Sequence, residues 1–359
     1  MKNIVALGGE GIGPEVVDAT CEILTAAKIP VQITTPVHGE VAMKAHGSGM
    51  PDATKAACEA ADAVLFGAAG GSATSAVVKW LRWEKGTFAS VRPVKHYPGA
   101  SSPLARPDGI DYVIVREVSE GLYPGREGEL KDLARAMPEL RDKFGRGIAE
   151  YGDGRFAVKV VTRAGVERAA RFSCELARRR KARGSRGTLT CITKSNVMPT
   201  SDGLFRQTVA DVVKREYPDL GYEHFYVDDG ARRLVRFPQQ MDVVLTMNLY
   251  GDILTDMAGE TAGGLGMAPS GCYRDGWAYF ESVHGSAPDI AGRGIANPTG
   301  TILSAVMMLE HVKLDAEARR LEAAVARVYR DGKTLTADQG GTASTKEFAR
   351  AVLEAYRNQ

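Results

Sequence analysis

Two aspartates near residue 250 have the spacing that a metal site requires. Asp252 and Asp256 are four residues apart in the segment NLYGDILTD, which follows a short apolar run. If this segment is a helix, both carboxylates lie on one face and repel each other unless a cation neutralises them. A hard divalent ion with oxygen ligands fits that requirement. The alternative is a pair of acids favoured by the helix dipole at a helix start, and the segment alone leaves both interpretations open.

Three arginines stand beside predicted ends of strands or helices: Arg82, Arg92 and Arg116. A guanidinium group can bind a carboxylate through two parallel hydrogen bonds, so this set suits a substrate with several carboxylates. Arg116 follows the apolar run 112–115, at the sheet edge where α/β proteins form their sites, and Tyr123 follows it in the segment EGLY. For any one of these arginines, an ordinary surface position is an equally good interpretation.

Two loops rich in small residues are candidates for ligand contact. Residues 8–15, GGEGIGPE, lack the G-x-G-x-x-G spacing, and Pro14 removes a helical donor that could have faced a phosphate. A dinucleotide site of the Rossmann type is therefore not indicated. Residues 284–292, HGSAPDIAG, offer several backbone donors, and such loops either bind nucleotides or form plain turns.

The elements that must position these residues alternate between short β-branched runs and helical patterns. Strands buried on both faces are predicted at 4–7, 64–66, 112–115, 158–161 and 243–245. Helices are predicted after Pro14 and along the stripe Leu321, Val325 and Val328. This alternation predicts an α/β fold with a largely parallel sheet.

Two polar segments need a separate interpretation. The glycine-rich stretch 145–154 predicts a loop or an arm that reaches a partner. The basic run 178–183, RRRKAR, could contact nucleic acid, but a helix end favoured by the dipole before the break at Gly184 is the better interpretation.

Bulk composition excludes several classes of protein. The formal net charge is +2, so the overall charge requires neither nucleic acid nor an anionic membrane as a partner. No apolar run is long enough to span a membrane, and the N-terminus predicts a strand rather than a signal peptide. The five dispersed cysteines predict free thiols in a reducing compartment, so we expect a cytoplasmic protein.

Read together, these segments resemble the β-decarboxylating dehydrogenases, which act on isocitrate, isopropylmalate, homoisocitrate and tartrate or D-malate. The resemblance runs from Ile4 to the C-terminal helix and rests on ordered motifs: GEGIGPE, LRW…VRP, VREVSEGLY, TKSNV, YVDDG, NLYGDILTD, FESVHGSAPDIAGRGIANPTG and AVMMLEH. It implies a two-domain α/β fold of the isocitrate/isopropylmalate dehydrogenase type with a non-Rossmann dinucleotide site. We expect residues 1–97 and 263–359 to form the cofactor domain, and residues 98–262 the substrate and dimerisation domain.

The resemblance also implies roles for individual residues. Three arginines match those that hold the malate carboxylates, and Tyr123 matches the final general acid. Lys194 and Asp228 match a catalytic pair that reaches the active site of the partner subunit, which implies at least a homodimer. The metal ligands, for Mg²⁺ or Mn²⁺, match Asp228, Asp252 and Asp256. The cofactor loop matches His284, Gly285, Ser286, Ala287, Asp289, Ile290 and Asn297.

The chemistry of these residues fits oxidative decarboxylation. Lys194 with Asp228 can remove the C2 hydroxyl proton, hydride passes to the nicotinamide, and the resulting β-keto acid loses CO2. The metal stabilises the enolate, and Tyr123 then protonates C3. Asp289 matches the position that faces the adenosine ribose, where a carboxylate accepts hydrogen bonds from the hydroxyls and repels a 2′-phosphate. We therefore expect NAD rather than NADP.

The substrate's variable group is predicted from the residues before Arg82. The family resemblance implies a pair of leucines in isopropylmalate enzymes at the positions where this chain has Val78 and Lys79. Homoisocitrate enzymes have a basic residue there. A lysine buried without an anion is costly, so we expect an anionic C3 branch: a carboxylate, as in isocitrate or homoisocitrate, or a phosphonate. The alternative for Lys79 is that it extends to solvent. The alternative substrates are 3-isopropylmalate and tartrate or D-malate.

The chain departs from the family pattern at several positions. These are Glu10, Val118, Asp229, Arg232, Arg233 and Glu260, and they put the substrate in doubt rather than the reaction. The rival class is a non-catalytic regulatory subunit of a mixed oligomer. Such subunits should lose the lysine, the tyrosine or a metal aspartate, whereas all are present here, so we expect an active enzyme.

Overall fold

A single ten-stranded sheet runs through the protein, in the order β2-β1-β3-β12-β11-β4-β5-β10-β8-β9. The computed structural model describes residues 1–359. Neighbouring strands are parallel at both ends of the sheet, whereas the central pairs β12–β11, β11–β4 and β4–β5 are antiparallel. A small two-stranded sheet, β6-β7, lies outside it. The chain thus has the expected α/β fold with a mostly parallel sheet.

The strands are short and mostly buried, as apolar runs covered on both faces should be. Their bounds are β1 Lys2–Gly9, β2 Val31–Thr34, β3 Ala63–Ala68, β4 Ala89–Lys95, β5 Asp111–Glu117, β6 Glu127–Glu129, β7 Arg155–Ala157, β8 Thr188–Thr193, β9 Gly221–Tyr226, β10 Val243–Thr246, β11 Pro269–Arg274 and β12 Trp277–Ser282. The predicted strands at 4–7, 64–66, 112–115 and 243–245 are confirmed.

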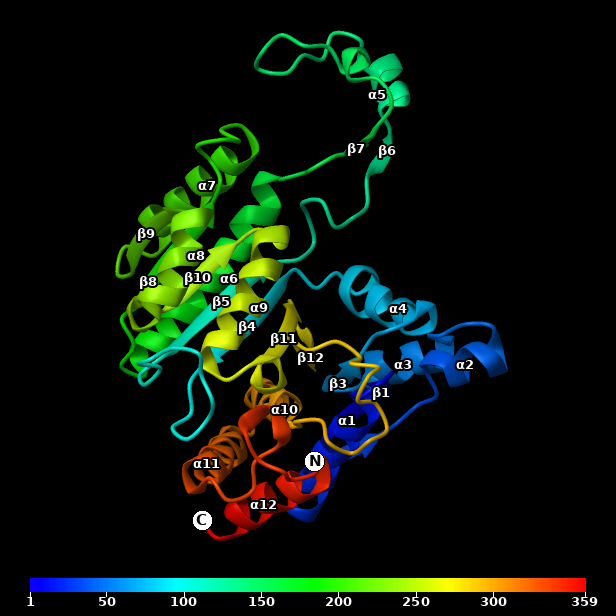
Figure 1. The fold of residues 1–359 in the computed structure, drawn as a ribbon, viewed down its shortest axis with the longest axis vertical. Helices are drawn as coiled ribbons and strands as arrows, with labels where there is room; N and C mark the ends of the chain where they lie inside the picture. Colours follow the sequence, from blue (N-terminus) through cyan, green and yellow to red (C-terminus); the bar gives the residue numbers. More distant parts are fainter.

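The chain has twelve α-helices, which pack around this sheet except for α5, which lies apart from it (Figure 1). Their bounds are α1 Gly13–Ala26, α2 Gly39–His46, α3 Asp52–Ala60, α4 Ser72–Lys79, α5 Leu130–Ala136, α6 Arg163–Ala182, α7 Ser201–Glu216, α8 Val227–Arg236, α9 Asn248–Ala262, α10 Thr299–His311, α11 Asp315–Asp331 and α12 Thr345–Arg357. Short helical turns are η1 Trp80–Glu84, η2 Ile148–Tyr151, η3 Pro238–Gln240, η4 Leu265–Met267 and η5 Ala337–Gln339. Both predicted helices are confirmed: Pro14 lies in the first turn of α1, and the stripe of Leu321, Val325 and Val328 is buried in α11.

An arm leaves the body of the molecule after β5 and returns before α6, carrying β6, α5, η2 and β7 (Figure 1). No residue of α5 or η2 is buried, and Phe144 near the tip is 83% exposed. The glycine-rich stretch 145–154 lies within this arm. A bridge between Gly121 and Val160 and the hydrogen bonds from Thr162 to Glu120 close its base.

The strand predicted at 158–161 is wrong, and the arm explains why. Strand β7 ends at Ala157, Val158 is 40% exposed, and Val160 makes just the isolated bridge to Gly121. A β-branched run has high strand propensity, but propensity depends on a neighbouring surface against which the side chains can pack. The arm supplies no such surface in this chain.

The basic run 178–183 is the end of helix α6, as predicted. Arg178 pairs with Asp219 and Arg183 with Glu310, while Arg180 pairs with both Asp111 and Asp242. Gly184 follows with a positive φ of 96°, a conformation that ends the helix at little cost for glycine. These partners anchor the run within the fold.

The buried core divides into four main hydrophobic clusters. One joins α1, α10, α11 and α12 to the strands near the N-terminus, and another joins α6 and α7 to β5, β8 and β10. Smaller clusters lie beneath α4 and beside α9. None of the helices is both long and apolar enough to cross a membrane.

Candidate active site

The central strands place Arg92 and Arg116 on one face of the sheet. Strands β4 and β5 are antiparallel, with Ser90 opposite Arg116 and Arg92 two residues further along. Because side chains alternate along a strand, Ser90, Arg92 and Arg116 share a face. Both arginines are almost fully buried, with 7% and 1% of their surface exposed. A buried guanidinium needs anionic or polar partners, and helix α9 supplies them.

Helix α9 turns its acidic face toward these arginines. Asp252 pairs with Arg116 and lies 3.7 Å from Nη1 of Arg92, and Asp256 lies 3.4 Å from the same nitrogen. Gly251 makes this approach possible, because a Cβ there would lie 2.5 Å from Cγ of Arg116. The predicted i, i+4 arrangement on one helix face is confirmed, and arginines lie opposite it.

Asp252 also accepts a hydrogen bond from the Tyr123 hydroxyl. The ring of Tyr123 lies 4.8 Å from the Arg116 guanidinium carbon, so the phenol is held from two sides. Burial, together with the hydrogen bond to Asp252, raises the pKa of Tyr123. The phenol is therefore kept protonated, which is the state that a terminal proton donor needs.

Asn248 fixes the loop that carries Tyr123. Its Oδ1 accepts hydrogen bonds from Nε and Nη2 of Arg116, at 3.0 and 2.7 Å. Its Nδ2 donates to the backbone carbonyls of Val118 and Glu120, both at 3.0 Å. One amide thus joins Arg116 to the start of the arm. Asn248 opens the NLYGDILTD motif, but its role at the site was not predicted from the sequence.

The donor atoms of Asp252 and Asp256 suit a hard divalent cation, because carboxylate oxygens are its preferred ligands. Burial raises the pKa of Asp256, and the neighbouring Asp252 carboxylate adds to the effect while Arg92 opposes it. A cation between the two carboxylates would relieve that repulsion. No group of three histidine, cysteine or acidic side chains in the chain is arranged to hold a metal ion, so Asp228 does not join this pair within one chain.

Lys194 and Asp228 form a separate ion pair beyond the ends of β8 and β9. Asp202, fully buried at the start of α7, accepts a hydrogen bond of 2.8 Å from the backbone N–H of Lys194. Asp202 also pairs with Lys159, whose ammonium lies 5.1 Å from the ring centroid of Tyr250. The predicted catalytic residues therefore fall into two groups within one chain: the pair Lys194–Asp228, and the cluster around Asp252.

The two loops of small residues meet. The N–H of Ile12 donates to the carbonyl of Ser286 at 2.9 Å, and a Cβ on Gly11 would lie 1.9 Å from that oxygen. Gly11 has a φ of +60°, so glycine is required there for two reasons. Ala287 and Ile290 pack against the small apolar cluster of Ile12, Val16 and Ala296. The glycine loop therefore supports the loop that was predicted to bind the cofactor.

Some residues of the predicted cofactor loop have polar atoms free to bind a ligand, and others use theirs within the protein. Asp289 is exposed and makes no hydrogen bond, and the buried Nε2 of His284 has no protein partner. Gly285 has open space around it. Asn297 is committed to the protein: its Nδ2 donates to Tyr329 and Asp338, and its Oδ1 accepts from the Thr299 N–H.

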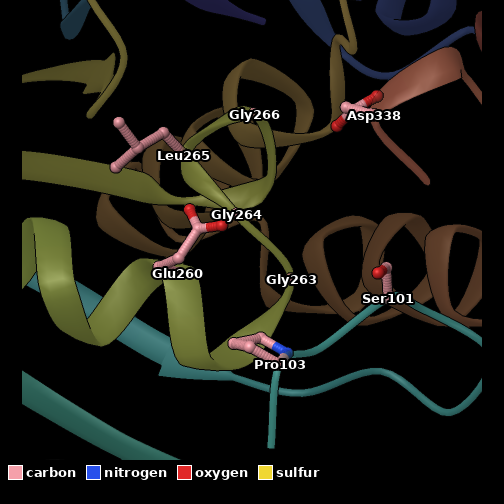
Figure 2. Close-up of a pocket in the computed structure, with 8 residues that line it drawn as sticks. All are labelled: Ser101, Pro103, Glu260, Gly263, Gly264, Leu265, Gly266 and Asp338. Atoms are coloured by element: carbon pink, nitrogen blue, oxygen red, sulfur yellow. The ribbon is translucent and has the colours of Figure 1, made fainter.

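A polar pocket of about 180 Å³ is lined partly by Asp338, the residue to which Asn297 donates a hydrogen bond (Figure 2). Glu260 at the end of α9 and Asp338 of η5 lie on opposite sides of the loop Gly263–Gly266 in this view. Glu260, one of the departures from the family pattern, thus lines a pocket rather than packing in the core. The other departures on α8 pair with one another, because Asp229 binds both Arg232 and Arg233 at 2.7 Å.

Arg82 lies on the π-helical turn η1, and its partners come from strand β12. Nη2 of Arg82 is 3.3 Å from Oε1 of Glu281, and Nε is 3.5 Å from the hydroxyl of Tyr279. Short π-helical turns often occur at functional sites. Tyr279 and Glu281 were not predicted from the sequence, since nothing in their spacing connects them to a residue almost two hundred positions earlier.

The residues predicted to contact the C3 substituent of the substrate, Val78 and Lys79, lie at the end of α4. Val78 is partly buried and packs against the cluster beneath α4. Lys79 is exposed, and it makes no hydrogen bond or ion pair. Within one chain, Lys79 therefore extends to solvent instead of lying in an apolar pocket.

Comparison with known proteins assigns the chain to a family. The family model of isocitrate/isopropylmalate dehydrogenases matches residues 3–352. The chain belongs to this family. Its members are decarboxylating dehydrogenases, so the resemblance seen in the ordered motifs is confirmed.

Three similar proteins carry different substrate names. The 3-isopropylmalate/3-methylmalate dehydrogenase of Methanocaldococcus jannaschii is 43% identical over 359 residues, which is all of both chains. The isocitrate/homoisocitrate dehydrogenase of Thermus thermophilus is 39% identical, over 99% of this chain and 98% of its own. The structure of isocitrate dehydrogenase from Methylococcus capsulatus covers 99% of this chain and all of its own, with a TM-score of 0.86 and 35% identity.

Proposed function

We propose that the protein is an NAD- and divalent-metal-dependent dehydrogenase that oxidises and decarboxylates a 3-substituted malate. The observation that carries this proposal is the convergence of Arg92, Arg116 and Tyr123 on the carboxylates of Asp252 and Asp256. Buried arginines bind the substrate's carboxylates, and a protonated phenol beside them donates the final proton. The intact acidic and basic set argues against the alternative of a non-catalytic regulatory subunit.

The chain's own residues account for binding and proton transfer. Arg82, Arg92 and Arg116 hold the malate carboxylates, and Lys194 with Asp228 takes the proton from the C2 hydroxyl. When bound, NAD supplies the hydride acceptor, and Mg²⁺ or Mn²⁺ held by Asp252, Asp256 and a third carboxylate supplies charge stabilisation. After loss of CO2, Tyr123 delivers a proton to C3. We assign the third carboxylate to Asp228 of the partner subunit.

The C3 substituent that the similarity favours is a small alkyl group. The relative at 43% identity is named for 3-isopropylmalate and 3-methylmalate, and the isocitrate/homoisocitrate relative is less similar. Lys79 supports a second candidate, an anionic branch as in isocitrate, homoisocitrate or a phosphonate, because its ammonium is free to pair with an added anion. We rank the alkylmalate first, which reverses the preference drawn from Lys79 alone.

A panel of malates tests the proposal and separates the two candidates. NADH formation from 3-isopropylmalate, 3-methylmalate, isocitrate, homoisocitrate and D-malate should be highest with an alkylmalate, and EDTA should abolish it until Mg²⁺ or Mn²⁺ is added. If an anionic substrate is preferred instead, Lys79→Leu should depress its turnover far more than that of isopropylmalate. No turnover of any malate with NAD or NADP would refute the dehydrogenase assignment.

We propose NAD over NADP on the basis of Asp289. Its carboxylate is exposed and unpaired beside the cofactor loop, where it would accept hydrogen bonds from ribose hydroxyls and repel a phosphate. His284 also has a polar atom available to the cofactor, since its buried Nε2 lacks a protein partner. The catalytic efficiency kcat/KM should be at least about tenfold higher with NAD, a difference of roughly 1.4 kcal/mol. Equal efficiency with NADP would contradict this assignment.

The domain division and the compartment remain part of the proposal. The larger of the two main hydrophobic clusters is formed by residues 1–97 and 263–359, and the second almost entirely by residues 98–262. This separation supports two units joined through the central strands.

All five cysteines are free thiols, as in a reducing cytoplasm. A homodimer is the smallest assembly that brings a second Lys194–Asp228 pair to each site.

A further inference from the structure

Beneath Arg82 lies a closed ring of hydrogen bonds built on strand β12. Tyr279 and Glu281 are two residues apart on this strand, so their side chains share one face. Nε of Arg82 donates to the Tyr279 hydroxyl at 3.5 Å, and that hydroxyl donates to Oε1 of Glu281 at 3.4 Å. Nη2 of Arg82 donates to the same carboxylate oxygen at 3.3 Å. The ring therefore joins three groups through three contacts of 3.3–3.5 Å, each longer than a typical protein hydrogen bond.

Burial makes this ring more than a surface contact. Tyr279 is 0% exposed, and the side chains of Glu281 and Arg82 are 11% and 15% exposed. Cys272 lies opposite Tyr279 across the β11–β12 pair, and its thiol is 3.8 Å from the Glu281 carboxylate. A buried phenol hydroxyl needs a partner, and a buried carboxylate needs a positive charge. In the ring, the Glu281 carboxylate accepts the hydrogen bond of the phenol, and the Arg82 guanidinium supplies the positive charge.

The ring decides which edge of the guanidinium is free. Nε and Nη2 form the fork that would bind a carboxylate through two parallel hydrogen bonds, and both nitrogens are occupied. Nη1 makes no hydrogen bond to the protein. Arg82 can thus offer a substrate the end of its guanidinium, Nη1 and the second N–H of Nη2, in a fixed direction, whereas Arg92 and Arg116 are held by partners on α9.

We infer that Tyr279 is a positioning residue for substrate binding: its hydroxyl closes the ring that fixes the plane of Arg82 and directs the free end of the guanidinium, Nη1 and the second N–H of Nη2, toward a malate carboxylate. The inference rests on the proposed dehydrogenase function and extends it to a residue outside the family's catalytic set. Tyr279 acts through Arg82 and touches no substrate atom. Its loss should therefore weaken the binding of the malate in the ground state and in the transition state alike.

Tyr279→Phe removes the hydroxyl, and with it the closed ring of hydrogen bonds, but keeps the aromatic side chain. The KM for the preferred malate should rise about three- to tenfold, the range expected for the loss of one ordinary intramolecular hydrogen bond, while kcat and the KM for NAD stay within about twofold. Tyr112→Phe is the matched control, because Tyr112 on β5 is equally buried and its hydroxyl has no partner. A fall in kcat at constant KM, or an equal rise of KM in the control, would overturn the inference.

A double-mutant cycle tests whether the effect passes through Arg82. In an Arg82→Met background, Tyr279→Phe should leave the malate KM within about 1.5-fold, since the hydroxyl then has no guanidinium to position. The same factor in both backgrounds would refute the inference. Wild-type turnover on the malate panel is measured first, so failure of the proposed function is distinguished from failure of the positioning role.

A second variant covers the case in which Tyr279→Phe does not fold. Arg82→Lys leaves the buried tyrosine unchanged, but its compact ammonium lacks the planar fork that holds Tyr279 and Glu281 on one edge and directs the other toward a substrate carboxylate. The malate KM should rise as much as in Arg82→Met. A lysine variant whose malate KM is near that of the wild type would show that the hydrogen-bonded ring does not contribute to malate binding.

Discussion

Asp252 is the residue on which the predicted chemistry converges. It accepts hydrogen bonds from Arg116 and Tyr123 and lies close to Arg92, so a single carboxylate orients a substrate arginine and a proton donor. A metal bound to Asp252 would compete with these contacts. In the proposed mechanism, the substrate's carboxylates would take the place of Asp252 as partners of Arg116 and Tyr123. The contacts within the free chain hold the residues near their working positions.

His224 provides a test at the scale of one residue. Its ring Nε2 lies 2.9 Å from Oγ1 of Thr193, the residue before Lys194. Burial, with a smaller contribution from the charge of Arg206, lowers the pKa of His224 from 6.5 to about 4. Between these values the unfolded chain binds a proton that the folded chain does not, so stability rises with pH across this window and is lost as the pH falls from 6.5 toward 4.

His224→Gln keeps a hydrogen-bond partner for Thr193 and cannot titrate. We therefore expect the urea midpoint of the variant to fall less than that of the wild type when the pH is lowered from 6.5 to 4.5. Urea denaturation at both pH values measures the difference. Equal losses in the two proteins would mean that burial of His224 does not contribute to acid sensitivity.

At the scale of elements, the active site depends on two loops that lie far apart in the sequence. The loop before α1 and the loop after β12 meet at Gly11 and Ser286, because β1, β3 and β12 are neighbours in the sheet. The cofactor loop therefore takes its shape partly from the N-terminal segment. The same principle operates between β4 and β5, whose register brings Arg92 and Arg116 to one face.

Gly11→Ala should separate these two loops. The new Cβ would lie 1.9 Å from the carbonyl oxygen of Ser286, so the backbone must move. We expect the KM for NAD to rise about tenfold or more, since a positive φ and the lost contact each cost roughly 1–3 kcal/mol. Steady-state kinetics with varied NAD measures the change.

Gly276→Ala is the matched control for this substitution. Gly276 also has a positive φ, +73°, but no atom lies within 4 Å of the new Cβ. The variant should lose stability through backbone strain alone and keep its KM for NAD. If both alanine variants raise that KM equally, the contact between the loops is not what shapes the cofactor site.

At the scale of the whole molecule, one chain does not bring together all of the predicted catalytic groups. Lys194 contacts Asp228, and Asp202 holds its backbone, whereas Tyr123 contacts Asp252. The exposed arm that follows Tyr123 offers a route for contact with a second copy of the chain. Sites shared between two subunits account for both observations.

Subunit complementation tests this arrangement. Lys194→Ala and Tyr123→Phe chains should each be nearly inactive, since loss of a positioned acid or base costs about 10²–10⁴-fold in rate. Mixed under conditions of subunit exchange, they should regain part of the wild-type activity, because some mixed dimers contain one intact site. NADH formation before and after mixing measures the recovery. A fully active monomer by light scattering would contradict shared sites.

Local spacing along the sequence determined those features that depend on a few neighbouring residues. The i, i+4 spacing of Asp252 and Asp256 predicted their common helix face, Pro14 predicted the start of α1, and the run before Gly184 predicted the end of α6. Helical periodicity and the signals at helix ends depend on residues within one or two turns, so they can be predicted directly from the sequence. The ordered motifs added the family and hence the roles of residues that spacing cannot assign.

Tertiary structure alone decided the contacts between residues far apart in the sequence. The ring of Arg82, Tyr279 and Glu281, the amide of Asn248 between Arg116 and the arm, and the meeting of Gly11 with Ser286 all depend on which strands are neighbours. Strand order is set by burial of the whole sheet, and no local pattern encodes it. The run 158–161 failed for the same reason: its residues have strand propensity, but the fold places them in an arm without a sheet to join.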